Sequence, residues 1–122
     1  MITSKAFKDW LKGQLPGANG YYSGSLGDGS LEKTITVYPY KGVTEAMQRI
    51  QGQPGYRNLA FTVLIRWTRQ SEESELFAHE VHKRIGAYPE HVTMHSGSPV
   101  FLGTDNGVHE YVINFSVLHK ED

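Results

Sequence analysis

Six histidines are the residues of this chain best suited to chemistry, and two of them lie near a glutamate. Glu75, His79 and His82 follow one another at spacings of four and three, so a helix would place them on one face. Imidazole and carboxylate groups are common ligands of zinc and iron. The His-Glu-x-x-His spacing of helical zinc sites is absent, however, and Lys83 beside the group would repel a cation. A solvent-facing helix surface is the main interpretation, and a small metal-dependent enzyme or binding module is the alternative.

Other catalytic patterns are missing from the sequence. The chain has no cysteine, and Gly97-Ser98-Pro99 does not fit the Gly-x-Ser-x-Gly turn that presents a serine nucleophile. Glu72, Glu73 and Glu75 form a carboxylate cluster, but the start of a helix explains them, because its free N–H groups favour negative charge. We therefore predict a protein that is not an enzyme, with no catalytic residues, no metal and no cofactor.

These residues are positioned by a strand that runs directly into a helix. Apolar side chains alternate through residues 58–70, which predicts a strand with one core face. The side chains of that face are Leu59, Phe61, Val63, Ile65 and Trp67. Ser71 stands at the N-cap position of a helix that Gly86 closes. The apolar stripe by which this helix packs on the strand is Phe77, Val81, Ile85 and Tyr88.

The remaining segments predict further strands and one more helix. Ser4 is the expected cap of an N-terminal helix, and residues 43–50 fit one or two helical turns. Residues 21–26 and 31–40 are expected to pair as a hairpin about a Gly-Asp-Gly turn. Further strands are expected at 91–95, 100–102 and 108–119, the last two joined by the turn sequence Asn106-Gly107. The predicted fold is α+β, a mainly antiparallel mixed sheet packed in two layers against the N-terminal and central helices.

Length and composition limit the classes of protein to consider. The chain has 122 residues, which suits a single domain spanning 1–122 with one core. Its net charge of −1 gives no basic stripe for sequence-specific nucleic-acid binding. Charges interrupt the apolar residues of the N-terminus, so a signal peptide is not expected. No apolar run is long enough to cross a bilayer, and we expect a soluble protein without a membrane partner.

Several short segments are similar to the minor capsid proteins of tailed bacteriophages. They are Tyr21-Tyr22, Leu26-Gly-Asp-Gly-Ser-Leu-Glu-Lys33, Ile35-Thr-Val-Tyr38, Gly55-Tyr56, Phe61-Thr-Val-Leu-Ile-Arg-Trp67 and Glu110-Tyr-Val-Ile113. The resemblance implies a structural neck or tail protein, made in the host cytoplasm and assembled into the virion. Its closest implied role is that of a tail terminator, a hexameric ring that caps the tail tube and docks the head connector. The alternative is a head-completion protein, a stopper or adaptor on the portal side.

A ring of this kind needs contacts with its own copies, with the tail-tube protein and with the head-tail connector protein. Aromatic and arginine side chains are enriched at protein interfaces. On that basis Tyr38, Tyr40, Arg66 and Trp67 are the interface candidates.

Overall fold

The computed structural model describes residues 3–24, 32–40 and 56–120. Within them lie helices α1 (Ser4–Gln14) and α2 (Ser71–Gly86). The strands are β1 (Gly20–Ser23), β2 (Thr34–Pro39), β3 (Tyr56–Arg66), β4 (His91–Met94), β5 (Val100–Asp105) and β6 (Val108–Lys120). The helical segment predicted at 43–50 and the Gly-Asp-Gly turn lie outside the described residues.

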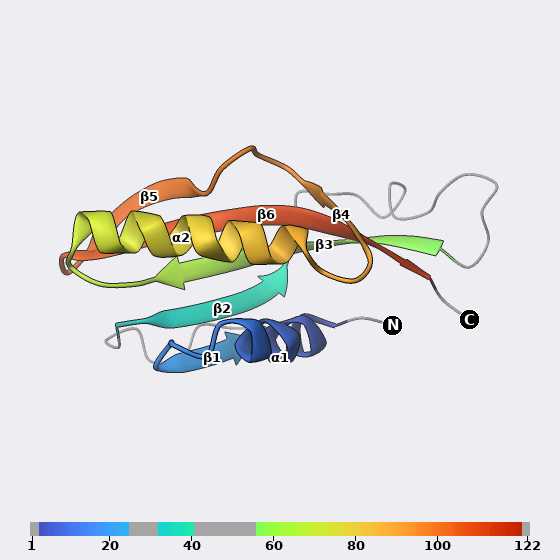
Figure 1. Ribbon diagram of the computed structural model, residues 1–122, viewed down its shortest axis with the longest axis horizontal. Coiled ribbons are helices and arrows are strands. Elements are labelled where there is room, and N and C mark those ends of the chain that lie inside the picture. The colour runs from blue at the N-terminus through green and yellow to red at the C-terminus, as the bar shows by residue number, and fades with distance from the viewer. Residues whose placement is uncertain (1–2, 25–31, 41–55, 121–122) are drawn as a thin grey trace.

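All six of these strands belong to one sheet with the order β1-β2-β3-β6-β4. β5 also pairs with β6, so β4 and β5 follow each other along the same side of that long strand. Only β1 and β2 run parallel, and every other pair is antiparallel. Both helices lie on one side of the sheet, α1 over β1 and β2, α2 over β6 and β4 (Figure 1). The predicted α+β fold with two layers is confirmed.

The core fills the space between the sheet and the two helices. Alternate residues of β3 and β6 enter it, as strand periodicity requires. Phe7 of α1 is fully buried, and its ring lies within 4.9–6.0 Å of the rings of Trp10, Phe61, Tyr88 and Phe115. This aromatic cluster joins α1 and the segment that follows α2 to the two central strands. The predicted core face of β3 is therefore confirmed.

The predicted hairpin of residues 21–26 and 31–40 is wrong, because β1 and β2 are parallel. A tight turn reverses the direction of the chain and so joins antiparallel strands. Two parallel strands instead need a longer connection that carries the chain back to the end of the sheet where the first strand began. Backbone hydrogen bonds fix this arrangement at Lys33, which has a φ of 58°. Its carbonyl accepts from the N–H of Asn19 at 2.6 Å, and its N–H donates to the carbonyl of Trp67 at 2.8 Å. Lys33 therefore ties the start of β2 to both neighbouring strands.

Both predicted helix caps are displaced by one residue. Thr3 caps α1 by accepting a hydrogen bond from the N–H of Ala6 at 3.1 Å, and Ser4 is the first helical residue. In α2 the N-cap is Gln70, whose side chain makes no capping bond, and Ser71 is the exposed first residue of the helix. Gly86 is the last helical residue of α2 rather than its cap, which is Ala87.

A buried hydroxyl replaces the expected cap of α2. Ser74 is fully buried, and its Oγ accepts from the N–H of Thr68 and donates to the Thr68 carbonyl, both at 3.2 Å. Thr68 Oγ1 in turn accepts from the N–H of Gln70 at 3.2 Å. These bonds fasten the first turn of α2 to the segment that follows β3.

Replacing Ser74 by alanine is expected to lower the free energy of unfolding by about 1–3 kcal/mol, because the buried Thr68 N–H loses its partner. Ser71→Ala, at the exposed residue predicted to be the cap, is the matched control and should change it by less than about 0.5 kcal/mol. Urea denaturation followed by tryptophan fluorescence measures both. Equal losses in the two variants would contradict the role assigned to Ser74.

Candidate functional site

The face of the sheet turned away from the helices is the first surface to consider. Tyr38, Thr62 and Asn114 lie side by side on it in the register of β2, β3 and β6. Thr62 Oγ1 donates to Asn114 Oδ1 at 2.6 Å, and no helix covers this face within the described ranges. We call it the open face because no described helix lies over it, although the side chains at its centre, Thr62 and Ser116 among them, are buried. Its central hydroxyl and amide groups bond to one another, so its polar groups are already partnered within the sheet.

Two of the four interface candidates lie partly exposed on the open face. Burial raises the pKa of Tyr38, whose side chain is half-buried. The ring of Tyr40 lies 5.6 Å from that of His95, and His95 Nε2 is 2.7 Å from Ser116 Oγ. These side chains cross the sheet from β2 to β4 and leave area available for contact with another protein.

The other two candidates are buried inside the chain. Arg66 is 4% exposed, and its guanidinium contacts Glu110 at 2.8 Å and Asp105 at 3.1 Å. Trp67 is 5% exposed and stacks on Phe77 with ring centroids 3.4 Å apart. Their contacts hold the end of β3 in place. The four candidates therefore do not form one surface patch.

The structure does not arrange the three residues of the metal-binding alternative as a metal site. Glu75 and His79 are exposed on α2, and His82 Nε2 lies 3.1 Å from the carbonyl of Ser96. No group of three His, Asp or Glu side chains is placed to hold a metal ion in the part of the chain that is described.

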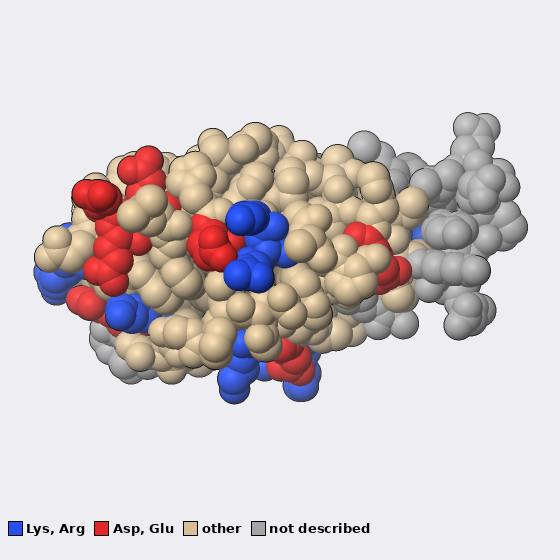
Figure 2. Space-filling model, viewed as in Figure 1, with Lys and Arg blue, Asp and Glu red and all other residues tan. Residues whose placement is uncertain are grey.

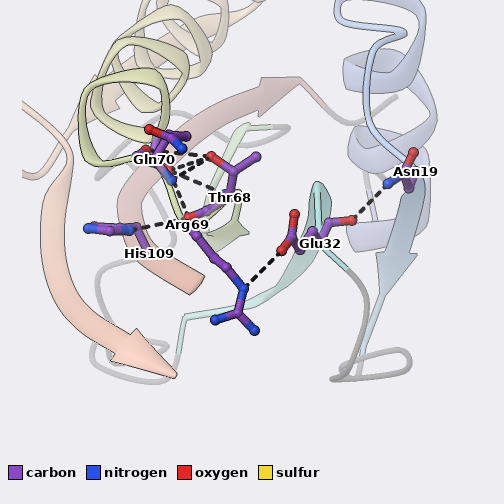
Figure 3. Close-up of polar contacts among 7 residues, drawn as sticks. Asn19, Glu32, Thr68, Arg69, Gln70 and His109 are labelled. Atoms are coloured by element: carbon purple, nitrogen blue, oxygen red, sulfur yellow. Dashed lines mark hydrogen bonds and ion pairs between the residues drawn. The ribbon is translucent and has the colours of Figure 1, made fainter. Parts of the chain in front are cut away.

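A polar cluster occupies the end of the sheet where β2 begins and α2 starts (Figure 3). Arg69 Nε lies 3.5 Å from a Glu32 carboxylate oxygen, and Asn19 Nδ2 donates to the Glu32 carbonyl at 3.1 Å. His109 Nδ1 is 3.2 Å from the carbonyl of Thr68. Each contact links segments that are distant in sequence. The cluster therefore joins the ends of strands.

An open hollow of about 510 Å³ lies between the start of α1 and the ends of β1 and β2. Its lining residues are Thr3, Ser4, Lys5, Ser23, Gly24, Pro39, Tyr40, Leu59, Ala60 and Phe61. The described part of the lining is mainly apolar, and none of the described lining residues is a histidine, aspartate or glutamate.

The most unusual surface is the apolar run Val100, Phe101 and Leu102 in β5. These side chains are 45%, 52% and 54% exposed. A bulge at Leu102 sets Phe101 opposite Tyr111 and Gly103 opposite Glu110, and Gly103 takes a φ of 120°. Phe101 packs on the ring of Tyr111 at 5.2 Å but keeps half of its surface in solvent. Large exposed apolar side chains that adjoin one another mark interaction sites.

Sequence reasoning placed a strand at 100–102 but did not identify it as a surface. The available signal was three consecutive apolar residues, because neighbouring side chains of a strand point to opposite faces and cannot all enter one core.

Comparison of the sequence with protein-family models and with curated proteins finds no match. Neither helix in the described ranges has the length and apolar character needed to span a membrane.

Proposed function

We propose that this protein is a structural component of a tailed-phage neck, a tail terminator that works as a homo-hexameric ring. The resemblance to minor capsid proteins suggests the role, and the two-layer α+β fold is the one it implies. The exposed apolar run of β5 is the observation that carries the proposal. Apolar side chains exposed to water are unfavourable on an isolated subunit. The assembly is stabilised when a neighbouring subunit covers them.

The magnitude of this effect indicates how the ring must be built. Three apolar side chains that are about half exposed contribute roughly 2–4 kcal/mol when covered. Association costs about 4–15 kcal/mol in lost translational and rotational freedom. The run alone is therefore too small to hold two subunits together. A ring adds further contacts along the sheet edge and gives every subunit two interfaces.

The mechanism is geometric and needs no cofactor. One face of the ring matches the last ring of tail-tube protein and stops its polymerisation, while the opposite face receives the head-tail connector protein. Tyr38 and Tyr40, partly exposed on the open face, are the side chains we assign to these contacts.

Native mass spectrometry and negative-stain electron microscopy test the proposal on the full chain. The expected result is a closed ring of six subunits that binds the ends of purified tail tubes. A protein that stays monomeric at high concentration and ignores tube ends contradicts the proposal. Binding to portal complexes but not to tubes favours the head-completion role, and stoichiometric zinc or iron in elemental analysis favours the metal-dependent alternative.

A further inference from the structure

Within the described strands the sheet has two edges, on opposite sides of the molecule, that pair with no further strand. Among the described strands β5 pairs only with β6, and β1 pairs only with β2. β5 forms the upper border in Figure 1, and β1 with α1 forms the lower border. A strand with one neighbour has backbone N–H and C=O groups able to pair with another chain.

The β5 edge is apolar with negative charge beside it. Glu75 of α2 lies near Tyr111, the residue on which Phe101 packs. Burial first, and then the charge of Glu75, raise the pKa of Tyr111. Glu75 has no ion-pair partner within the described ranges. Figure 2 shows acidic side chains gathered where α2 begins, which include Glu72 and Glu73 of its first turn.

The α1–β1 edge carries the opposite charge. Lys5 and Lys8 bind Asp9 at 2.9 and 2.6 Å, and these lysines, Lys8 most strongly, lower the pKa of Asp9 to about 2. Lys12 pairs with no carboxylate in the described part of the chain. Its ammonium lies 5.6 Å from the ring centre of Tyr21 in β1. This edge therefore presents an unneutralised lysine beside aromatic side chains.

We propose that the β5 edge of one subunit packs against the α1–β1 edge of the next copy, with Glu75 facing Lys12. The proposal rests on the proposed function and names the two surfaces that form its ring contact. Pairing of like edges would place two acidic edges, or two basic edges, against each other, and both arrangements are repulsive. Pairing of unlike edges joins opposite charges, covers Val100, Phe101 and Leu102, and uses each edge once per subunit. A contact between unlike edges closes into a ring when the rotation between neighbouring subunits is a whole fraction of a full turn.

Two edge variants test the assignment. One carries Phe101→Asp and Leu102→Asp, and the other carries Lys12→Glu and Tyr22→Asp. Each variant alone is expected to be monomeric, since one of its edges is blocked. Tyr22, changed in the second variant, is a half-buried residue of the edge strand β1. Mixed in equal amounts, the two variants should form a dimer of one copy of each and nothing larger, because only one pair of intact edges remains. Circular dichroism confirms folding, and Leu76→Asp, at a leucine 63% exposed on α2, is the matched control that should keep the ring.

Charge reversal gives a second measurement that does not depend on the apolar substitutions. Glu75→Lys and Lys12→Glu should each weaken association about 3- to 10-fold, and the double variant should recover most of the loss. A wild-type monomer overturns both this inference and the proposed function. If the wild-type protein forms a ring and both edge variants still form it, the edge assignment alone is overturned. The same conclusion follows if the two edge variants fail to pair when they are mixed.

Discussion

Replacing Phe7 by alanine should lower the free energy of unfolding by about 3–5 kcal/mol, the largest effect expected of any single substitution here. Phe7 is fully buried and joins α1 to the sheet through Phe61 and Phe115. It also contacts Tyr88, which follows α2, so its ring lies where all the layers of the core meet. Alanine leaves a cavity there that the surrounding rigid rings cannot fill.

Guanidinium denaturation at a protein concentration below that at which copies associate measures the loss, because association would also stabilise the folded chain and would be weakened by a change at Phe101. Phe101→Ala is the matched control. It removes the same ring from a site that is 52% exposed and should cost less than about 1 kcal/mol. Phe7→Leu keeps most of the volume and should fall between the two, which provides a measurement if the alanine variant does not fold. Similar losses at Phe7 and Phe101 would contradict this description of the core.

Replacing Arg66 by alanine should lower the free energy of unfolding by about 2–4 kcal/mol. The guanidinium is nearly buried, and its removal leaves the Glu110 carboxylate, whose side chain is only 22% exposed, without this cation. Asp105 is 57% exposed and is solvated by water once the arginine is gone. The effect therefore comes mainly from Glu110, and partial access of water to that carboxylate keeps the loss below that of a fully buried pair.

A double variant separates loss of a charge partner from loss of packing. Arg66→Met combined with Glu110→Leu removes both charges of the less exposed pair and should recover at least half of the stability lost in Arg66→Ala, because of these two carboxylates only Asp105 is left without the arginine, and water solvates it. Arg84→Ala is the matched control, since Arg84 binds Glu80 at 2.9 Å on the exposed surface of α2. That pair should contribute about 0.3–0.5 kcal/mol. A double variant as unstable as the single one would mean that the arginine acts through packing.

The segments predicted correctly are those whose structure depends on neighbouring residues. Alternation in β3 identified Phe61, Val63, Ile65 and Trp67 as core residues because a strand exposes opposite faces in turn. The turn at Asn106-Gly107 was also predictable from neighbouring residues, because asparagine and glycine favour the positive φ angles that they adopt here, 52° and 84°. Helical spacing likewise identified Val81 and Ile85 as buried residues of α2.

The predictions that failed depend on contacts between distant segments. The parallel pairing of β1 and β2 is held by hydrogen bonds from Lys33 to Asn19 and to Trp67, which no local pattern reveals. The hydroxyl that fastens α2 belongs to Ser74, because its partner Thr68 lies before the helix and both are enclosed by the fold. The serine at the expected N-cap position therefore did not predict how the start of α2 is held, whereas this buried pair explains it.

Local patterns in the sequence were sufficient to predict the α+β class and the core faces of β3 and α2, and they include no recognisable catalytic motif. Periodicity and local turn chemistry are enough for these conclusions because each arises within a few residues of chain. The burial of Arg66 and Trp67 and the exposure of the apolar run of β5 follow instead from how distant segments pack. Periodicity tells which side chains share a face, whereas exposure depends on whether a distant segment packs against that face. The candidate assembly surface is therefore a property of the folded chain.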